Sequence, residues 1–311
     1  MGDIDDIFRA GGSTASLSTD LGLLLDLPGR WEGKGFNLIA RPAKQGIPAN
    51  PTFFLELNGT HETLEFTAIG GDIPNRGDIE PTALLHGLHY LQSVVDCEDG
   101  SGIHKEPGLW VHVPPTAENP LETYVRQATI PHGDSLVAQS SFFKSLPGSP
   151  AINPVDSFPI PITDPIPPHN DVAHAVITNQ KYLEPYLTDM LPDDCLPKGL
   201  NAAKTIRDPT EVLRAQIKGQ TIQETIVIAI TTSFPSPLTS SPPLQGIVNI
   251  PFITRNANTT QMDAIFWIEK VAHPKIPHKH FMQLQYVQRV ILDFAQIHWP
   301  HFSVATLIKA S

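Results

Sequence analysis

The chain has 311 residues, which is enough for one large domain or two small ones. Its 21 lysines and arginines against 32 aspartates and glutamates give a net charge of −11. This balance excludes nucleic acid and an anionic membrane surface as expected partners, because both attract a basic footprint. Only 17% of the residues are charged and 31 are proline, so strands joined by irregular loops are expected rather than a helical bundle.

The cysteines and the N-terminus bear on the compartment. Cys97 and Cys195 cannot build a disulfide framework. One bridge is possible, but the simpler interpretation is two reduced thiols in a cytoplasmic protein. Residues 1–6 are acidic where a secretory signal would be basic, and the apolar run 21–27 is too short to span a bilayer. We therefore expect a cytoplasmic location.

Strand signals dominate the chain after a flexible lead at 1–20 and a short helix or turn at 21–27. Apolar and polar residues alternate in many segments, which indicates strands with one face in a core and the other in water. Such alternation occurs at Phe53, Leu55 and Leu57, for example. The predicted strands lie at about 53–57, 64–68, 84–95, 108–113, 122–130, 135–143, 224–232, 246–253, 262–271, 282–287 and 304–309.

A proline-rich, partly helical insertion interrupts these strands at about 145–220. Its first part, 144–170, is expected to be extended and not to pack as an element, whereas 179–191 and 210–218 have helical spacing. The strands on either side must share one sheet, because neither half alone closes a barrel without edges. The prediction is a single all-β domain over residues 21–311, an antiparallel calycin-like barrel of about eight to ten strands.

Three motifs could carry chemistry. In the first, Gly29 to Gly35, Trp31 flanked by glycines can plug one end of a barrel. In the second, alternation places His104 and Glu106 on one face of an extended segment, where they form a bridging pair or line a pocket. The third is the closing segment 297–309, in which His301 follows a proline that fixes its direction.

These motifs, in this order, resemble the nitrobindin family of heme-binding barrels. Such barrels are also found at the end of some THAP-type proteins. The likeness covers roughly 27–143 and 260–309. It implies heme b in the barrel mouth with His301 as the iron ligand, and a heme pocket that includes Trp31, Gly33, Gly35 and Glu106. A neutral imidazole is a good iron ligand, and one axial histidine leaves the opposite face open to a small molecule. The family's described activities are conversion of peroxynitrite to nitrate and nitric oxide binding.

Two features depart from the family pattern. Residues 36–42 replace its usual stretch after the opening motif, and the 145–220 insertion is extra. We expect the insertion to cover an open barrel end, as an enzyme with an organic substrate requires.

Three functions are compatible with these features. The first is a heme enzyme, an oxidoreductase or a peroxynitrite isomerase, that acts on peroxide, peroxynitrite, oxygen or a nitrogen oxide, with an apolar organic molecule as a further candidate substrate. His104 and His132 are then its catalytic candidates; His132 lies in a predicted hairpin turn. The second is a nitric oxide sensor or carrier, and the third a heme-free carrier of fatty or other apolar ligands. A homodimer is compatible with all three.

Overall fold

The computed structural model describes residues 20–43, 53–78, 82–192, 195–234 and 244–310. The predicted flexible lead therefore lies outside the described residues, apart from its last position. None of the described helices is long and apolar enough to cross a membrane.

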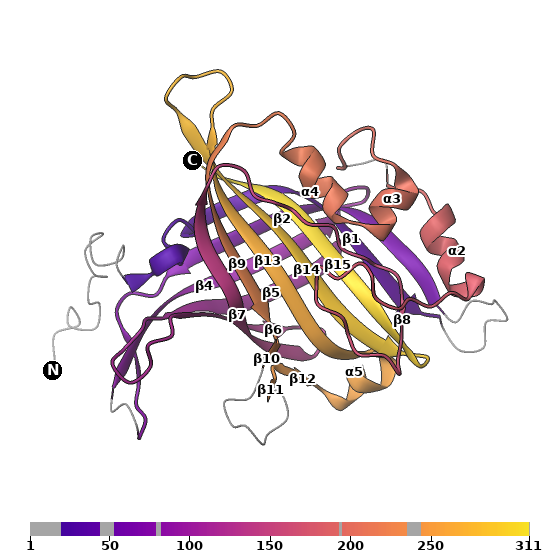
Figure 1. The fold of residues 1–311 in the computed structure, drawn as a ribbon, viewed down its shortest axis with the longest axis horizontal. Coiled ribbons are helices and arrows are strands. Elements are labelled where there is room, and N and C mark those ends of the chain that lie inside the picture. Colours follow the sequence, from indigo (N-terminus) through magenta and orange to yellow (C-terminus); the bar gives the residue numbers. More distant parts are fainter. Residues whose placement is uncertain (1–19, 44–52, 79–81, 193–194, 235–243, 311) are drawn as a thin grey trace.

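Ten antiparallel strands form a closed barrel, because β1 pairs with β2 on one side and with β15 on the other (Figure 1). This architecture confirms the predicted all-β, calycin-like barrel. In order around the barrel, the strands are β1 (Gly29–Pro42), β2 (Phe53–Ala68), β4 (Ala83–Asp96), β5 (Gly102–Val113), β6 (Thr123–Ile130), β7 (Asp134–Pro147), β9 (Ile222–Thr231), β13 (Asn258–Ala272), β14 (His280–Phe294) and β15 (Ile297–Lys309).

The two halves of the chain share this sheet, as predicted, since β7 and β9 are neighbours on either side of the insertion. Pro147 at the end of β7 lies opposite Glu224 of β9. The shorter elements are the 3-10 helix η2 (Gly22–Leu24), β3 (Ile73–Asn75), β8 (Ile160–Pro161), α2 (Gln180–Thr188), α3 (Ala202–Arg207), α4 (Thr210–Gln216), β10 (Ser233–Phe234), β11 (Leu244–Gln245), β12 (Ile247–Asn249) and α5 (Pro251–Asn256).

Most predicted elements are present, with some differences. The strands predicted at 53–57 and 64–68 form one strand, β2, and helix α3 was not predicted. The strand predicted at 246–253 is wrong in its second half, where Pro251 begins helix α5 after the three-residue strand β12. A proline is favoured at the first position of a helix because its missing N–H would have no partner there.

Two apolar cores lie on opposite faces of the barrel wall. The first fills the barrel interior at the end nearest η2, where Leu21, Leu24 and Leu27 pack with Trp31. The second lies outside the wall. It joins outward side chains of the barrel to the insertion and includes Phe36, Leu38, Phe302, Val304, Val155, Phe158, Tyr186, Ile206 and Leu213.

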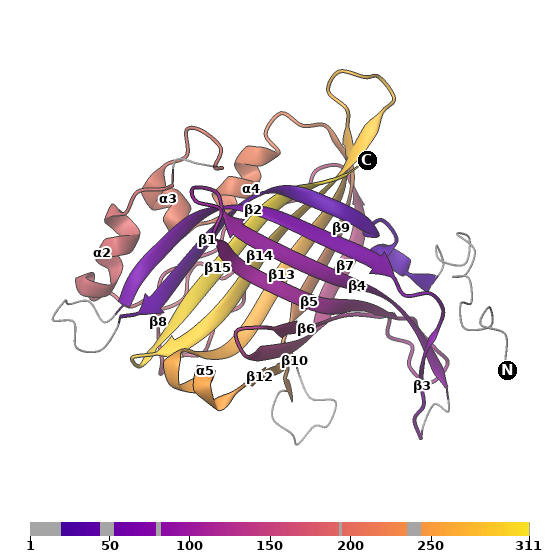
Figure 2. The ribbon, with the colours of Figure 1, turned by 180° about the vertical axis from the view of Figure 1, so that it is seen from behind.

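The insertion therefore covers the outer wall, and the expectation that it covers an open barrel end is wrong. Helices α2, α3 and α4 lie along one side of the barrel in both views (Figures 1 and 2). The proline-rich segment is also packed, contrary to prediction, since Ile152, Phe158 and Ile160 are buried. The outer strand faces are apolar here. Packing of the insertion against them removes this apolar surface from water, which stabilises the fold.

Cys97 and Cys195 form a disulfide, with their Cα atoms 6.2 Å apart. The prediction of two reduced thiols is therefore wrong. The bond joins the β4–β5 turn to the insertion. The prediction of a cytoplasmic location rested partly on free thiols and loses that support.

Candidate functional site

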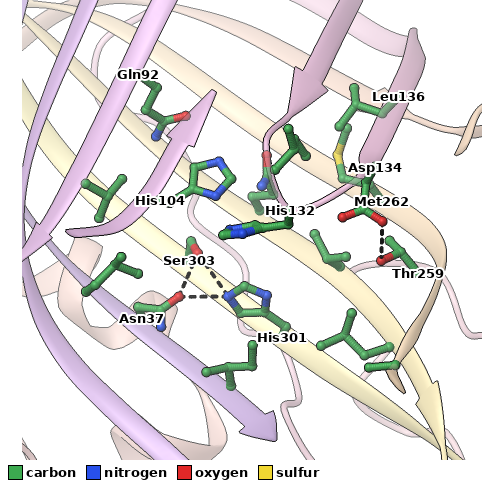
Figure 3. Close-up of a pocket in the computed structure, with 18 of the residues that line it drawn as sticks. Asn37, Gln92, His104, His132, Asp134, Leu136, Thr259, Met262, His301 and Ser303 are labelled. Atoms are coloured by element: carbon green, nitrogen blue, oxygen red, sulfur yellow. Dashed lines mark hydrogen bonds between the residues drawn. The ribbon is translucent and has the colours of Figure 1, made fainter. Parts of the chain in front are cut away.

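A cavity of about 610 Å³ occupies the barrel interior at the end opposite η2, next to α5. Its walls combine apolar and polar side chains from many strands of the barrel. The apolar side chains include Ile39, Val94, Ile130, Leu136, Met262 and Val290. Polar side chains gather at two places, a group of histidines and a group of hydrogen-bonded residues deeper in the barrel. Figure 3 shows the histidine group with its neighbours.

His301 enters the cavity from β15, because side chains alternate along a strand and Phe302 faces the outer core. A chain of amides fixes the orientation of its ring. Asn58 donates to Asp96 Oδ2 over 2.8 Å, and Asn37 Nδ2 donates to Asn58 Oδ1 over 3.3 Å. The Asn37 carbonyl oxygen is thereby turned toward His301, and it accepts a hydrogen bond from Nε2 over 2.7 Å.

This arrangement selects one tautomer of His301. An amide oxygen can only accept, so Nε2 carries the proton and Nδ1 holds the lone pair of the neutral ring. Nδ1 lies on the side of the ring away from Asn37 (Figure 3). Burial lowers the pKa of His301 to about 3, and His104 and His132 add to this effect. The imidazole is therefore neutral at physiological pH, which is the form that binds metals.

His104 and His132 line the same cavity, with their ring centroids 5.6 Å apart. His104 projects from β5, and its Nε2 lies 3.2 Å from Glu106 Oε2. His132 lies in the turn between β6 and β7, as predicted, but it faces the cavity mouth. Burial, followed by the neighbouring His104, lowers the pKa of His132. The structure thus brings all three predicted histidines together, while their catalytic roles stay predictions.

Glu106 is fully buried behind His104 and is not among the described residues that line the cavity. It forms an ion pair with Arg126, also buried, and accepts a hydrogen bond from the Tyr90 hydroxyl. Burial alone would raise the pKa of Glu106, but Arg126, His104 and Tyr90 outweigh it and hold the pKa at about 2. The carboxylate stays ionised and accepts a hydrogen bond from His104, which positions that ring.

The deeper polar group was not predicted from the sequence. Glu62 of β2, Gln92 of β4 and Tyr286 of β14 line the cavity and meet inside the closed sheet. Tyr286 donates to Glu62 Oε2 over 2.7 Å, and Gln92 Nε2 donates to the Tyr286 hydroxyl oxygen over 3.0 Å. One signal could have revealed them. Glu62 shares a strand face with Leu64 and Phe66, where a carboxyl group is unexpected unless it has a role.

Trp31, Gly33 and Gly35 are not among the described residues that line the cavity. Trp31 is fully buried at the other barrel end, and its indole N–H donates to the Leu27 carbonyl oxygen over 2.7 Å. Gly33 faces β15 so closely that a Cβ atom would lie 2.0 Å from the Thr306 carbonyl oxygen. The opening motif therefore serves barrel closure and packing in this chain, as its glycines permit close backbone approach.

The described residues contain no group of three or more histidine, cysteine or acidic side chains placed to hold a bare metal ion. A metal ion that is already coordinated by a macrocycle needs fewer protein ligands, and one imidazole is enough. His301 is a candidate for that single ligand.

No protein-family model matches the chain, and no curated protein matches it in sequence. Among solved structures, it is similar to the crystal structure of Rv2717c from M. tuberculosis, at 12% identity over 94% of this chain and 99% of that one, with a TM-score of 0.42. A likeness this distant leaves the chain's own side chains as the basis for any functional proposal.

Proposed function

We propose that the cavity binds heme b with His301 as the iron ligand, as in a nitrobindin-like protein, and that the protein acts on a small oxidant such as peroxide, peroxynitrite, oxygen or a nitrogen oxide. One observation carries the proposal: a neutral imidazole in the cavity wall, whose Nε2–H is held by Asn37 so that Nδ1 is free. Metal-binding histidines usually donate their second ring N–H in this way.

The cavity is compatible with heme in size and lining. Its volume of about 610 Å³ lies within the range typical of ligand and cofactor sites, roughly 300–1,000 Å³. The apolar walls suit a flat macrocycle. Arg41 at the rim is the one arginine or lysine among the described lining residues, and it pairs with Glu56. It is the side chain that we expect to meet the negative charge of a propionate.

Held by His301, heme would supply an iron position that binds a diatomic molecule or an oxidant. The chain's residues then act around that position. Asn37 holds the His301 ring, and Glu106 holds the His104 ring through Nε2. His132 is neutral at physiological pH and can accept a proton at the cavity mouth.

The test is a heme titration of the purified protein, of His301→Ala and of His61→Ala, followed by absorption spectroscopy. His61 is exposed on the same barrel but does not line the cavity, so it is the matched control. We expect a Soret band in the parent and in His61→Ala, and its loss or displacement in His301→Ala. A spectrum that is the same in all three proteins would contradict the role of His301.

The apolar walls also favour a second function, a heme-free carrier of apolar ligands. The same titration separates the two functions. A carrier would take up no heme, would stay colourless and would bind an apolar fluorescent probe equally well with and without His301.

A further inference from the structure

Two buried carboxyl groups lie inside the barrel, and the buried cation Arg126 pairs with only one of them. Glu106 and Glu62 are 0% and 2% exposed, and Arg126 is 3% exposed. Arg126 pairs with Glu106 and also donates to Gln288 and to the Tyr90 hydroxyl oxygen. Glu62 forms no ion pair with a lysine or arginine of the described part of the chain. An ionised carboxylate without a buried counter-charge is costly, so Glu62 tends to keep its proton.

Glu62 is also the carboxyl group of this pair that reaches the cavity. It lines the cavity floor, whereas Glu106 is hidden behind His104. A proton on Glu62 is therefore within reach of a bound ligand.

The immediate surroundings of Glu62 are prepared for its ionised form. Thr60 Oγ1 lies 3.0 Å from Oε1, while the Tyr286 hydroxyl and Gln92 Nε2 lie 2.7 and 3.3 Å from Oε2. All three groups can donate to a carboxylate. Burial raises the pKa of Glu62, and the three donors together with the charge of His104 lower it in part. These opposed effects are typical of groups that exchange protons.

We propose that Glu62 is an acid–base group of the cavity, which donates its proton to an oxygen or nitrogen atom of the bound substrate. This rests on the proposed function for the identity of the substrate, but not for the state of Glu62. In the step, the Glu62 O–H bond breaks and a new O–H or N–H bond forms on the substrate. The resulting carboxylate accepts from Tyr286, Thr60 and Gln92 until water that enters the cavity returns a proton.

Two other titratable groups act on Glu62 directly, His104 on β5 and Tyr286 on β14. Glu106 on β5, Arg126 on β6 and His301 on β15 are further ionisable groups of the same barrel. Glu106 and Arg126 neutralise each other, and the pKa of His301 is too low for it to be charged above about pH 4. Tyr286 stays protonated, because burial raises its pKa further above 10. The charge of His104 acts on the pKa of Glu62, so the test needs a variant that removes Glu62 alone.

The experiment has two arms, one of which needs no heme. In the first, azide affinity of the heme-loaded ferric protein is measured against pH for the parent, Glu62→Gln and Glu269→Gln. Glu269 is a matched control, since it is also a buried glutamate with a raised pKa but lies outside the cavity lining. We expect azide affinity in the parent and in Glu269→Gln to fall by up to tenfold per pH unit above the Glu62 pKa, because a carboxylate repels the anion. We expect no such fall in Glu62→Gln.

In the second arm, the carboxyl carbon of Glu62 is followed by NMR in the heme-free protein, with Glu62→Gln to assign the signal. We expect it to titrate well above the ordinary glutamate range, and at a still higher pH in Tyr286→Phe, which lacks one donor to the carboxylate. Titration in the ordinary range, or the same azide profile in the parent and Glu62→Gln, would overturn the proposal. Failure of heme uptake would count against the proposed function alone, because the NMR arm still decides the state of Glu62.

Discussion

At the scale of single residues, the cavity depends on side chains that hold other side chains in place. The side-chain oxygen of Asn37 points to His301 because its Nδ2 donates a hydrogen bond to Asn58. Asn58 is held in turn by a hydrogen bond to Asp96. Glu106 likewise accepts a hydrogen bond from His104. The sequence motifs pointed to the histidines and to Glu106. They did not point to Asn37 or Asn58, because these partners meet only when β1 and β2 pair at Asn37↔Asn58.

Removing this support should weaken heme binding without removing the ligand. We expect Asn37→Leu to lower heme affinity about 10- to 100-fold, the usual effect of losing the partner of a metal-binding histidine. Asn37→Asp keeps an oxygen acceptor and should retain most of the affinity. Heme titrations followed at the Soret band measure both. Equal affinity in the parent and Asn37→Leu would show that the ring needs no such support.

At the scale of elements, the sequence predicted most strands well because alternation along a strand is a local property. What it could not predict is which face points inward. In β2, Phe53, Leu55 and Leu57 face the outer core, whereas Leu64 and Phe66 face the interior. Both sets look like an inner face when each is read alone. Within β2, the apolar side chains therefore change from outward-facing to inward-facing positions. The outward-facing ones make sense only because the insertion covers that part of the outer wall.

The contact between the insertion and the barrel contains a buried carboxyl group that should make stability depend on pH. The group belongs to Glu269 of β13, which is fully buried. It accepts a hydrogen bond from Gln283 Nε2, and Gln283 is itself bonded to Gln220 at the end of the insertion. Burial raises the pKa of Glu269 to about 7, from an ordinary value of 4.5. The folded state therefore binds a proton more tightly than the unfolded state does.

The proton on Glu269 therefore stabilises the folded state. Stabilisation is complete below pH 4.5 and is lost as the pH rises through about 7. Relative to Glu269→Gln, we expect the parent to lose about 2.5 kcal/mol of unfolding free energy between pH 5 and pH 8. Urea unfolding at both pH values measures this, with the exposed Glu65→Gln as control. A parent and a Glu269→Gln variant that change in parallel would show that Glu269 is not the group responsible.

At the scale of the whole molecule, the disulfide and the outer core attach the insertion to the barrel. Neither was accessible to sequence reasoning, since two cysteines 98 residues apart give no indication that they meet. Cys97 follows β4, near the residues Ser101 to His104 that line the cavity. The bond thus links the outer covering to the part of the barrel that carries the site.

A disulfide that closes a loop of this length restricts the unfolded chain strongly. We expect the double variant Cys97→Ser, Cys195→Ser to lose about 2–5 kcal/mol of unfolding free energy. Urea unfolding with and without reductant provides the comparison, and the reduced parent should match the double variant. If reductant leaves the midpoint of the parent unchanged, the two cysteines do not form a stabilising bond in solution.

The place where the insertion leaves the barrel has a consequence for the history of such a chain. Because Pro147 and Glu224 lie opposite each other in adjacent antiparallel strands, everything between them could be replaced by a tight turn without changing the order of the strands. A shorter ancestor with the same barrel would need polar residues where Phe36, Leu38, Phe302 and Val304 now meet the insertion. Gain or loss of this segment therefore requires new side chains on one outer wall, and the interior cavity can be inherited unaltered.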